Sequence, residues 1–142
     1  MADITFTAAN IIPSSDAVYL YDPAVAGETL VAGDIVYYKT GDQRYWKADA
    51  GASATSKVAG MCAGGAAAGQ QFKLIISDSA CAVGAVLTQG YPYTLSDTAG
   101  KMCDVSTTIA AANQYVIVVG VAQTTSTLKF NFLTQAVGVL KA

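Results

Sequence analysis

The chain has 142 residues, enough for one domain with its own core, and only 13% of them are charged, against roughly 25% in typical soluble domains. Its eight basic residues are scattered and the net charge is −2, which argues against a nucleic-acid groove, because such grooves need clustered positive charge. The chain has no histidine, which excludes histidine-based catalysis and histidine metal ligands. A surface so poor in charge favours burial against copies of the chain or a larger assembly, and the alternative is a small, alanine-rich monomeric domain.

Short apolar and β-branched runs separated by turn residues predict many short strands. In chain order, strands are expected over residues 3–7, 17–21, 34–39, 44–48, 57–63, 72–76, 91–95, 101–105, 114–122 and 126–133. The clearest local prediction is a β-hairpin of residues 34–39 and 44–48 around a turn that contains Gly41. Residues 77–82 are expected to form a loop, residues 107–113 one helical turn, and residues 134–142 an apolar tail. The pattern is typical of an all-β protein, a small β-sandwich or barrel.

Two segments of the chain are echoed later in it. Leu30–Tyr37 is echoed by Leu87–Thr94 at an offset of 57 residues, and Val58–Ala63 is echoed by Val118–Ala122 at an offset of 60. The same order and nearly the same spacing predict two pseudo-repeated β units, neither of which can bury its apolar face alone.

No pattern in the chain indicates catalysis, a cofactor or a metal. The glycine-rich residues 64–69 lack the Gly-Lys-Ser/Thr ending of a phosphate loop and precede a strand. Most aspartates fall in or near predicted turns, where they serve backbone hydrogen bonding. The sequence therefore predicts that the chain is not an enzyme and has no catalytic, cofactor-binding or metal-binding residues.

The three cysteines are Cys62, Cys81 and Cys103, widely spaced and odd in number. They are expected to be reduced and buried, and one disulfide plus a free thiol is the alternative. The first residues contain no basic or apolar region of a signal peptide. The longest strongly apolar stretch, residues 115–122, is far short of the ~20 residues that cross a bilayer, so no membrane partner is expected.

Several of these motifs stand in the order found in a known family. They are Gly27–Tyr37, Tyr45–Ala50, Val58–Met61, Ala66–Gln70, Gly90–Ser96 with Ala99–Gly100, and Val118–Ala122 ahead of Thr127–Leu128. Over roughly residues 27–133 the chain resembles the capsid decoration (cement) proteins of tailed bacteriophages. These are scaffold motifs of glycine and small residues, and the family has no catalytic residues to carry over.

The resemblance implies a β-tulip-like barrel with extended N- and C-terminal arms, assembled as a homotrimer. It implies a structural virion protein that binds the major capsid protein where capsomers meet and stabilises the head against internal DNA pressure. The expected location is the outer capsid surface, after synthesis in the cytoplasm of the bacterial host.

The resemblance also divides the chain. Residues 1–26 would be an N-terminal arm, residues 27–133 the β domain and residues 134–142 a C-terminal tail. Candidate capsid contacts are Ile4, Phe6, Ile11 and Ile12, and candidate subunit contacts are Val137, Val139 and Leu140. The alternative for Ile4 and Phe6 is a place in the core of this domain, because alternating strands bury one face in either case.

A second function from another class is a carbohydrate-binding or tail-fibre module. It would use aromatic faces for stacking, namely Tyr19, Tyr21, Tyr45 and Trp46. The alternative for Trp46 is ordinary packing in the hairpin.

Overall fold

The fold comes from a computed structural model that describes residues 3–20, 23–106, 114–132 and 139–141. A single 3₁₀ turn, η1 (Ala8–Asn10), precedes the first strand. The strands are β1 (Ile11–Ile12), β2 (Val18–Tyr19), β3 (Ala24–Val25), β4 (Ile35–Lys39), β5 (Arg44–Lys47), β6 (Val58–Cys62), β7 (Gln71–Phe72), β8 (Leu74–Val83), β9 (Pro92–Leu95), β10 (Met102–Asp104), β11 (Gln114–Val116), β12 (Val118–Ala122), β13 (Thr127–Asn131) and β14 (Val139–Lys141).

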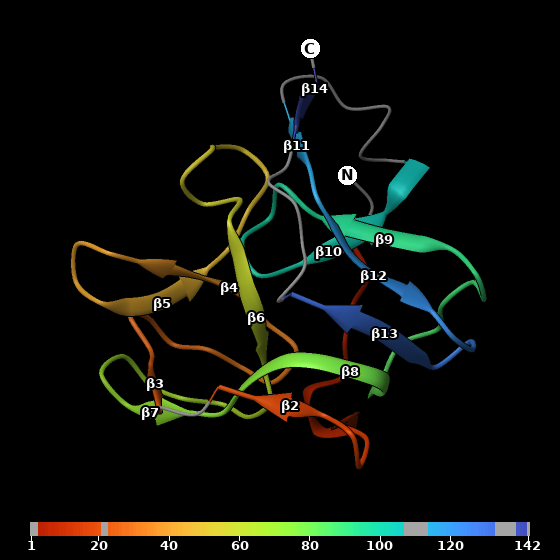
Figure 1. Ribbon diagram of the computed structural model, residues 1–142, viewed down its shortest axis with the longest axis horizontal. Helices are drawn as coiled ribbons and strands as arrows, with labels where there is room; N and C mark the ends of the chain where they lie inside the picture. The colour runs from red at the N-terminus through yellow and green to blue at the C-terminus, as the bar shows by residue number, and fades with distance from the viewer. Residues whose placement is uncertain (1–2, 21–22, 107–113, 133–138, 142) are drawn as a thin grey trace.

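Among the described residues, one antiparallel sheet dominates the molecule. Its strands follow the order β10-β9-β12-β13-β8-β6-β4-β5, and β1 and β2 also pair with β8. The sheet curls strongly into a half-barrel, as Figure 1 shows, with β8 crossing the lower part of the view above β2. Two short pairs, β3 with β7 and β11 with β14, lie outside this sheet. The predicted all-β class, compatible with a small barrel or sandwich, is confirmed.

The strand order reads as two copies of one arrangement, joined where β8 pairs with β13. In the first unit β4 pairs with β5 and β6, and β6 pairs with β8. In the second unit β9 pairs with β10 and β12, and β12 pairs with β13. Both units also have a register shift at the same place, between the first and third strands of each. The two pseudo-repeated units predicted from the sequence are therefore present as matching sets of four strands.

The same backbone hydrogen bond occurs at equivalent positions of the two units. The Gly33 N–H donates to the Cys62 carbonyl over 2.8 Å, and the Gly90 N–H donates to the Ala122 carbonyl over 2.8 Å. Both glycines have positive φ angles, 93° and 82°, which glycine adopts without steric cost. The repeated glycine therefore turns the chain into the first strand of each unit.

A second pair of equivalent glycines lies where a neighbouring strand passes very close. A Cβ atom on Gly60 would lie 2.6 Å from the Ile75 carbonyl oxygen, and one on Gly120 would lie 2.6 Å from the Lys129 carbonyl oxygen. Glycine inside a strand often marks such a close backbone approach. The central strand of each unit therefore depends on the absence of a side chain.

The interior is divided into a main core and a small core. The main core draws on both units: Ile11, Ile35, Ala48, Ala50, Met61, Ile75, Cys81, Val83, Leu87, Tyr93, Leu95, Met102, Ile117, Val119, Ala122, Leu128, Phe130 and Phe132. The small core belongs to the first unit: Ala24, Ala26, Leu30, Val36, Cys62, Ala66, Phe72 and Leu74. It is built with the help of β3 and β7, and β7 lies in the connection between β6 and β8. The matching connection in the second unit, between β12 and β13, holds only residues 123–126.

Three predicted boundaries are wrong. Residues 77–82 are not a loop, because β8 continues through them and pairs there with β13. Residues 114–122 are not one strand, because Ile117 is buried and separates β11, which pairs with β14, from β12, which pairs with β9. Residues 3–7 form no continuous strand, since only Asp3 makes a bridge, to Cys103. The predicted helical turn over residues 107–113 lies outside the described residues.

The N-terminal residues lie along the sheet in this isolated chain. The Ile4 N–H donates to the Met102 carbonyl over 2.8 Å, β1 pairs with the end of β8, and β2 pairs with its beginning. The described part of the expected arm, residues 3–20 and 23–26, is therefore integrated into the domain by backbone hydrogen bonds.

The three cysteines are all buried thiols that form no disulfide with one another, as expected for reduced cysteines. Burial raises the pKa of the Cys62 thiol to about 11 and that of Cys81 to about 12, and both therefore stay protonated and poorly nucleophilic near neutral pH.

We expect a maleimide to label the native protein at most slowly and to label three thiols per chain in denaturant. Mass spectrometry of the two samples measures this, and rapid labelling of the native protein would contradict the burial.

Candidate functional site

The described residues contain no cluster of side chains typical of a metal centre. No three cysteine, histidine, aspartate or glutamate side chains gather there as metal ligands. Within the same part of the chain, no helix is long and apolar enough to span a bilayer. The candidate sites are therefore surfaces and grooves.

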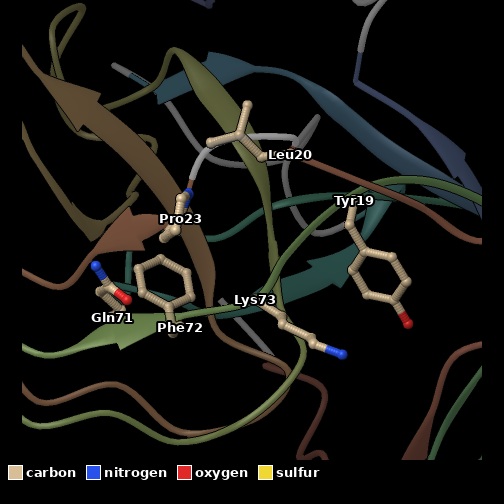
Figure 2. Close-up of a pocket in the computed structure, with 6 residues that line it drawn as sticks. All are labelled: Tyr19, Leu20, Pro23, Gln71, Phe72 and Lys73. Atoms are coloured by element: carbon tan, nitrogen blue, oxygen red, sulfur yellow. The ribbon is translucent and has the colours of Figure 1, made fainter.

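An open groove of about 420 Å³ lies between β2 and β7, and Figure 2 shows six residues that line it. Its lining residues are Tyr19, Leu20, Pro23, Gln71, Phe72 and Lys73. The Lys73 ammonium lies 5.5 Å from the centre of the Tyr19 ring, and the Phe72 ring meets the Tyr45 ring edge-on at 5.9 Å. None of these six described residues is an acid.

The aromatic residues proposed for sugar stacking are partly engaged within the chain. Trp46 is half-buried, its indole N–H donates to Asp42 over 3.0 Å, and its ring lies directly against the backbone of Gly27. Tyr45 packs against Phe72 and also against Tyr38. Tyr19 is 39% exposed. The remaining candidate, Tyr21, lies outside the described residues.

Two aspartates with shifted pKa values serve turns. Asp16 is exposed and accepts hydrogen bonds from the hydroxyls of Ser14 and Ser79, which lower its pKa and keep its carboxylate charged. Asp34 is buried and accepts the Val31 N–H over 2.9 Å, and burial raises its pKa. Asp34 thus holds its own turn, whereas Asp16 joins the turn at Ser14 to Ser79 of β8, and both arrangements are typical of structural aspartates.

One end of the half-barrel carries no charged residue. It is built from residues 4–15 and 79–96, which contain no Asp, Glu, Lys, Arg or His, and we call it the neutral end. Hydrogen bonds hold its two segments together: β1 pairs with Ala82 and Val83, and the Thr7 N–H donates to the Gly84 carbonyl over 3.3 Å. Gly84 has a positive φ of 62°, and a Cβ there would lie 2.8 Å from the Thr7 carbonyl oxygen. Glycine at this position lets the η1 turn pack against the loop that follows β8.

The neutral end exposes large apolar side chains. Ile12 is 62% exposed, Val86 is 88% exposed and Tyr91 is 46% exposed. Single exposed apolar residues are common on soluble proteins. Three exposed apolar side chains in segments without charges are instead typical of a surface that contacts another protein.

The structure distributes the predicted contact residues between core and surface. Ile11 is buried in the main core, Ile4 and Phe6 pack against that core while partly exposed, and Ile12 lies on the surface. Val139 and Leu140 lie in β14, where their backbones pair with Val116 and Tyr115. Only the backbone of these two residues is described. Val137 lies outside the described residues altogether. Val86 and Tyr91 were not among the predicted contacts, although the uncharged run that contains them is visible in the sequence.

The two units differ sharply in charge. Residues 22–78, which hold the first unit except the end of β8, contain eleven charged residues, whereas residues 79–136 contain four: Asp97, Lys101, Asp104 and Lys129. Since the units share one strand arrangement, the fold itself does not require this difference.

No protein-family model matches the sequence, and no curated protein matches it.

Proposed function

We propose that this chain is a structural virion protein that decorates the head of a tailed phage. Its neutral end docks on the major capsid protein at capsomer junctions, and the charged first unit faces the solvent. The observation that carries the proposal is the neutral end itself, where Ile12, Val86 and Tyr91 are exposed on a surface without charges. The resemblance of residues 27–133 to decoration proteins supports the same function.

Docking of this kind needs shape and apolar area but no reactive group. Burial of apolar surface contributes roughly 25 cal/mol for each Å² removed from water, so a few exposed side chains per copy give modest affinity. Self-association into a homotrimer, as the resemblance implies, would multiply that affinity, because several neutral ends then bind one shell together. A protein bound at capsomer junctions stabilises the shell because it binds the assembled head and not the separated subunits.

Co-sedimentation with purified phage heads tests the proposal. We expect the protein to bind expanded heads to saturation, to leave immature heads bare, and to raise the temperature at which expanded heads open. A protein that ignores both kinds of head would overturn the proposed function. Strong signals on a glycan array, together with bare heads, would support the carbohydrate-binding module in its place.

A further inference from the structure

Equivalent rows of side chains differ in burial between the two units. In the first unit three apolar residues lie side by side across β4, β6 and β8 and are each 0% exposed: Ile35, Met61 and Ile75. The pairing places three residues of β9, β12 and β13 at the same positions in the second unit: Pro92, Val121 and Lys129. Here Pro92 is half-buried, Val121 is 41% exposed and Lys129 is exposed. A row that is core in one copy is therefore surface in the other.

This surface is shallowly hollowed and mostly apolar. Val118, which is 46% exposed, lies beside Val121, and the two valines line a hollow of about 410 Å³ together with Lys129 and Asn131. We call Pro92, Val118, Val121, Lys129 and Asn131 the open face. Lys129 is the single charged residue of this set.

A negative charge lies next to the open face, beyond Lys129. There β8 bulges between Asp78 and Cys81 opposite β13, and the Ser79 hydroxyl within the bulge donates to Asp16 over 2.5 Å. Lys129 and Asp16 line one further shallow hollow. The hydroxyls of Ser14 and Ser79 keep the Asp16 carboxylate charged. A cation and an anion side by side make a surface that complements itself: around a rotation axis at this place, each Lys129 would approach the Asp16 of a neighbouring copy.

We propose that a second copy of this chain covers the open face, so that Val118 and Val121 are buried between copies and Lys129 of one copy pairs with Asp16 of the next. The inference rests on the self-association included in the proposed function and names the surface through which the copies associate. Of the open face only Pro92 also belongs to the neutral end; Val118, Val121, Lys129 and Asn131 lie outside it, and the test uses the purified protein without phage heads. Failure here therefore leaves docking to the shell untouched, and failure of docking leaves this inference untouched.

The test is the molar mass in solution, measured by sedimentation equilibrium over a wide concentration range. Wild-type protein is expected to have a molar mass of at least twice the 14.5 kDa of one chain. Val121→Lys places a second cation beside Lys129 in an apolar contact and should weaken association about 100-fold. An exposed valine outside the open face serves as the matched control, Val31→Lys, which should associate like wild type. A thermal melt of each variant checks that it is folded.

A charge exchange tests the ion pair separately. Lys129→Asp and Asp16→Lys should each weaken association, and the double variant should regain most of it, because the pair is restored with its signs reversed. A monomeric wild-type protein at every concentration, or folded Val121→Lys that associates as tightly as the control, would overturn the proposal. Failure of the double variant to exceed both single variants would overturn the pairing of Lys129 with Asp16.

Discussion

Alanine in place of Gly60 or Gly120 is expected to lower the free energy of unfolding by about 3 kcal/mol or more. The new Cβ would lie 2.6 Å from a carbonyl oxygen of the next strand at either position, closer than atoms of this kind approach. A leucine side chain closes the space further, with Leu74 Cγ at 2.9 Å in the first unit and Leu128 Cγ at 2.9 Å in the second. The strands must separate to admit the methyl group, and sheet hydrogen bonds and core packing weaken together.

Urea unfolding followed by circular dichroism measures the loss, and Gly41→Ala and Gly64→Ala are the matched controls. A Cβ at either control position meets nothing within 4 Å, so their stabilities should stay within about 0.5 kcal/mol of wild type. The similar surroundings of Gly60 and Gly120 predict similar losses. Equal stability of Gly120→Ala and Gly64→Ala would show that the strands are not packed as described.

Lysine in place of Val86 is expected to weaken binding to expanded heads by about 100-fold or more. Val86 is 88% exposed, so the substitution leaves the folded chain intact while placing a charge in the middle of the neutral end. Full burial of a valine contributes about 1.5 kcal/mol or more, and a lysine in its place adds the cost of removing a charge from water. The loss is repeated at each copy that contacts the shell.

The control for this variant is Val31→Lys, because Val31 is 47% exposed and belongs to the charged first unit. It should bind heads as wild type does, and Ile12→Lys should behave like Val86→Lys. Co-sedimentation at several protein concentrations gives the affinities. If Val31→Lys lost binding and Val86→Lys kept it, the docking surface would lie on the first unit.

The sequence was most informative where local chemistry decides the structure. The hairpin of β4 and β5 was predictable because β-branched and aromatic residues flank a turn with Gly41. The duplication was predictable because Gly33 and Gly90 turn the chain through positive φ and cannot be exchanged freely. Such positions can be recognised from the residue type alone.

Tertiary packing decided what the sequence did not reveal. Residues 77–82 contain Ser, Asp and Ala and look like a loop, yet pairing with β13 holds them in one long strand. The apolar run over residues 114–122 gave no sign of its division at Ile117, because a buried connection and a buried strand have the same composition.

The candidate site was predictable only in part. Apolar residues near the N-terminus were expected to be contacts, but the sequence could not show that Ile11 enters the main core while its neighbour Ile12 faces solvent. Val86 and Tyr91 became candidates only once their exposure was known, since the exposure of a side chain depends on the whole topology. The open face required comparison of two equivalent rows in space.

Electron cryo-microscopy of expanded heads decorated with the purified protein tests the central claim most directly. The account predicts density on the outer surface at capsomer junctions, with the loop that contains Val86 against the shell and the β4–β5 hairpin pointing away from it. Bare heads, or copies bound with the β4–β5 hairpin against the shell, would contradict it.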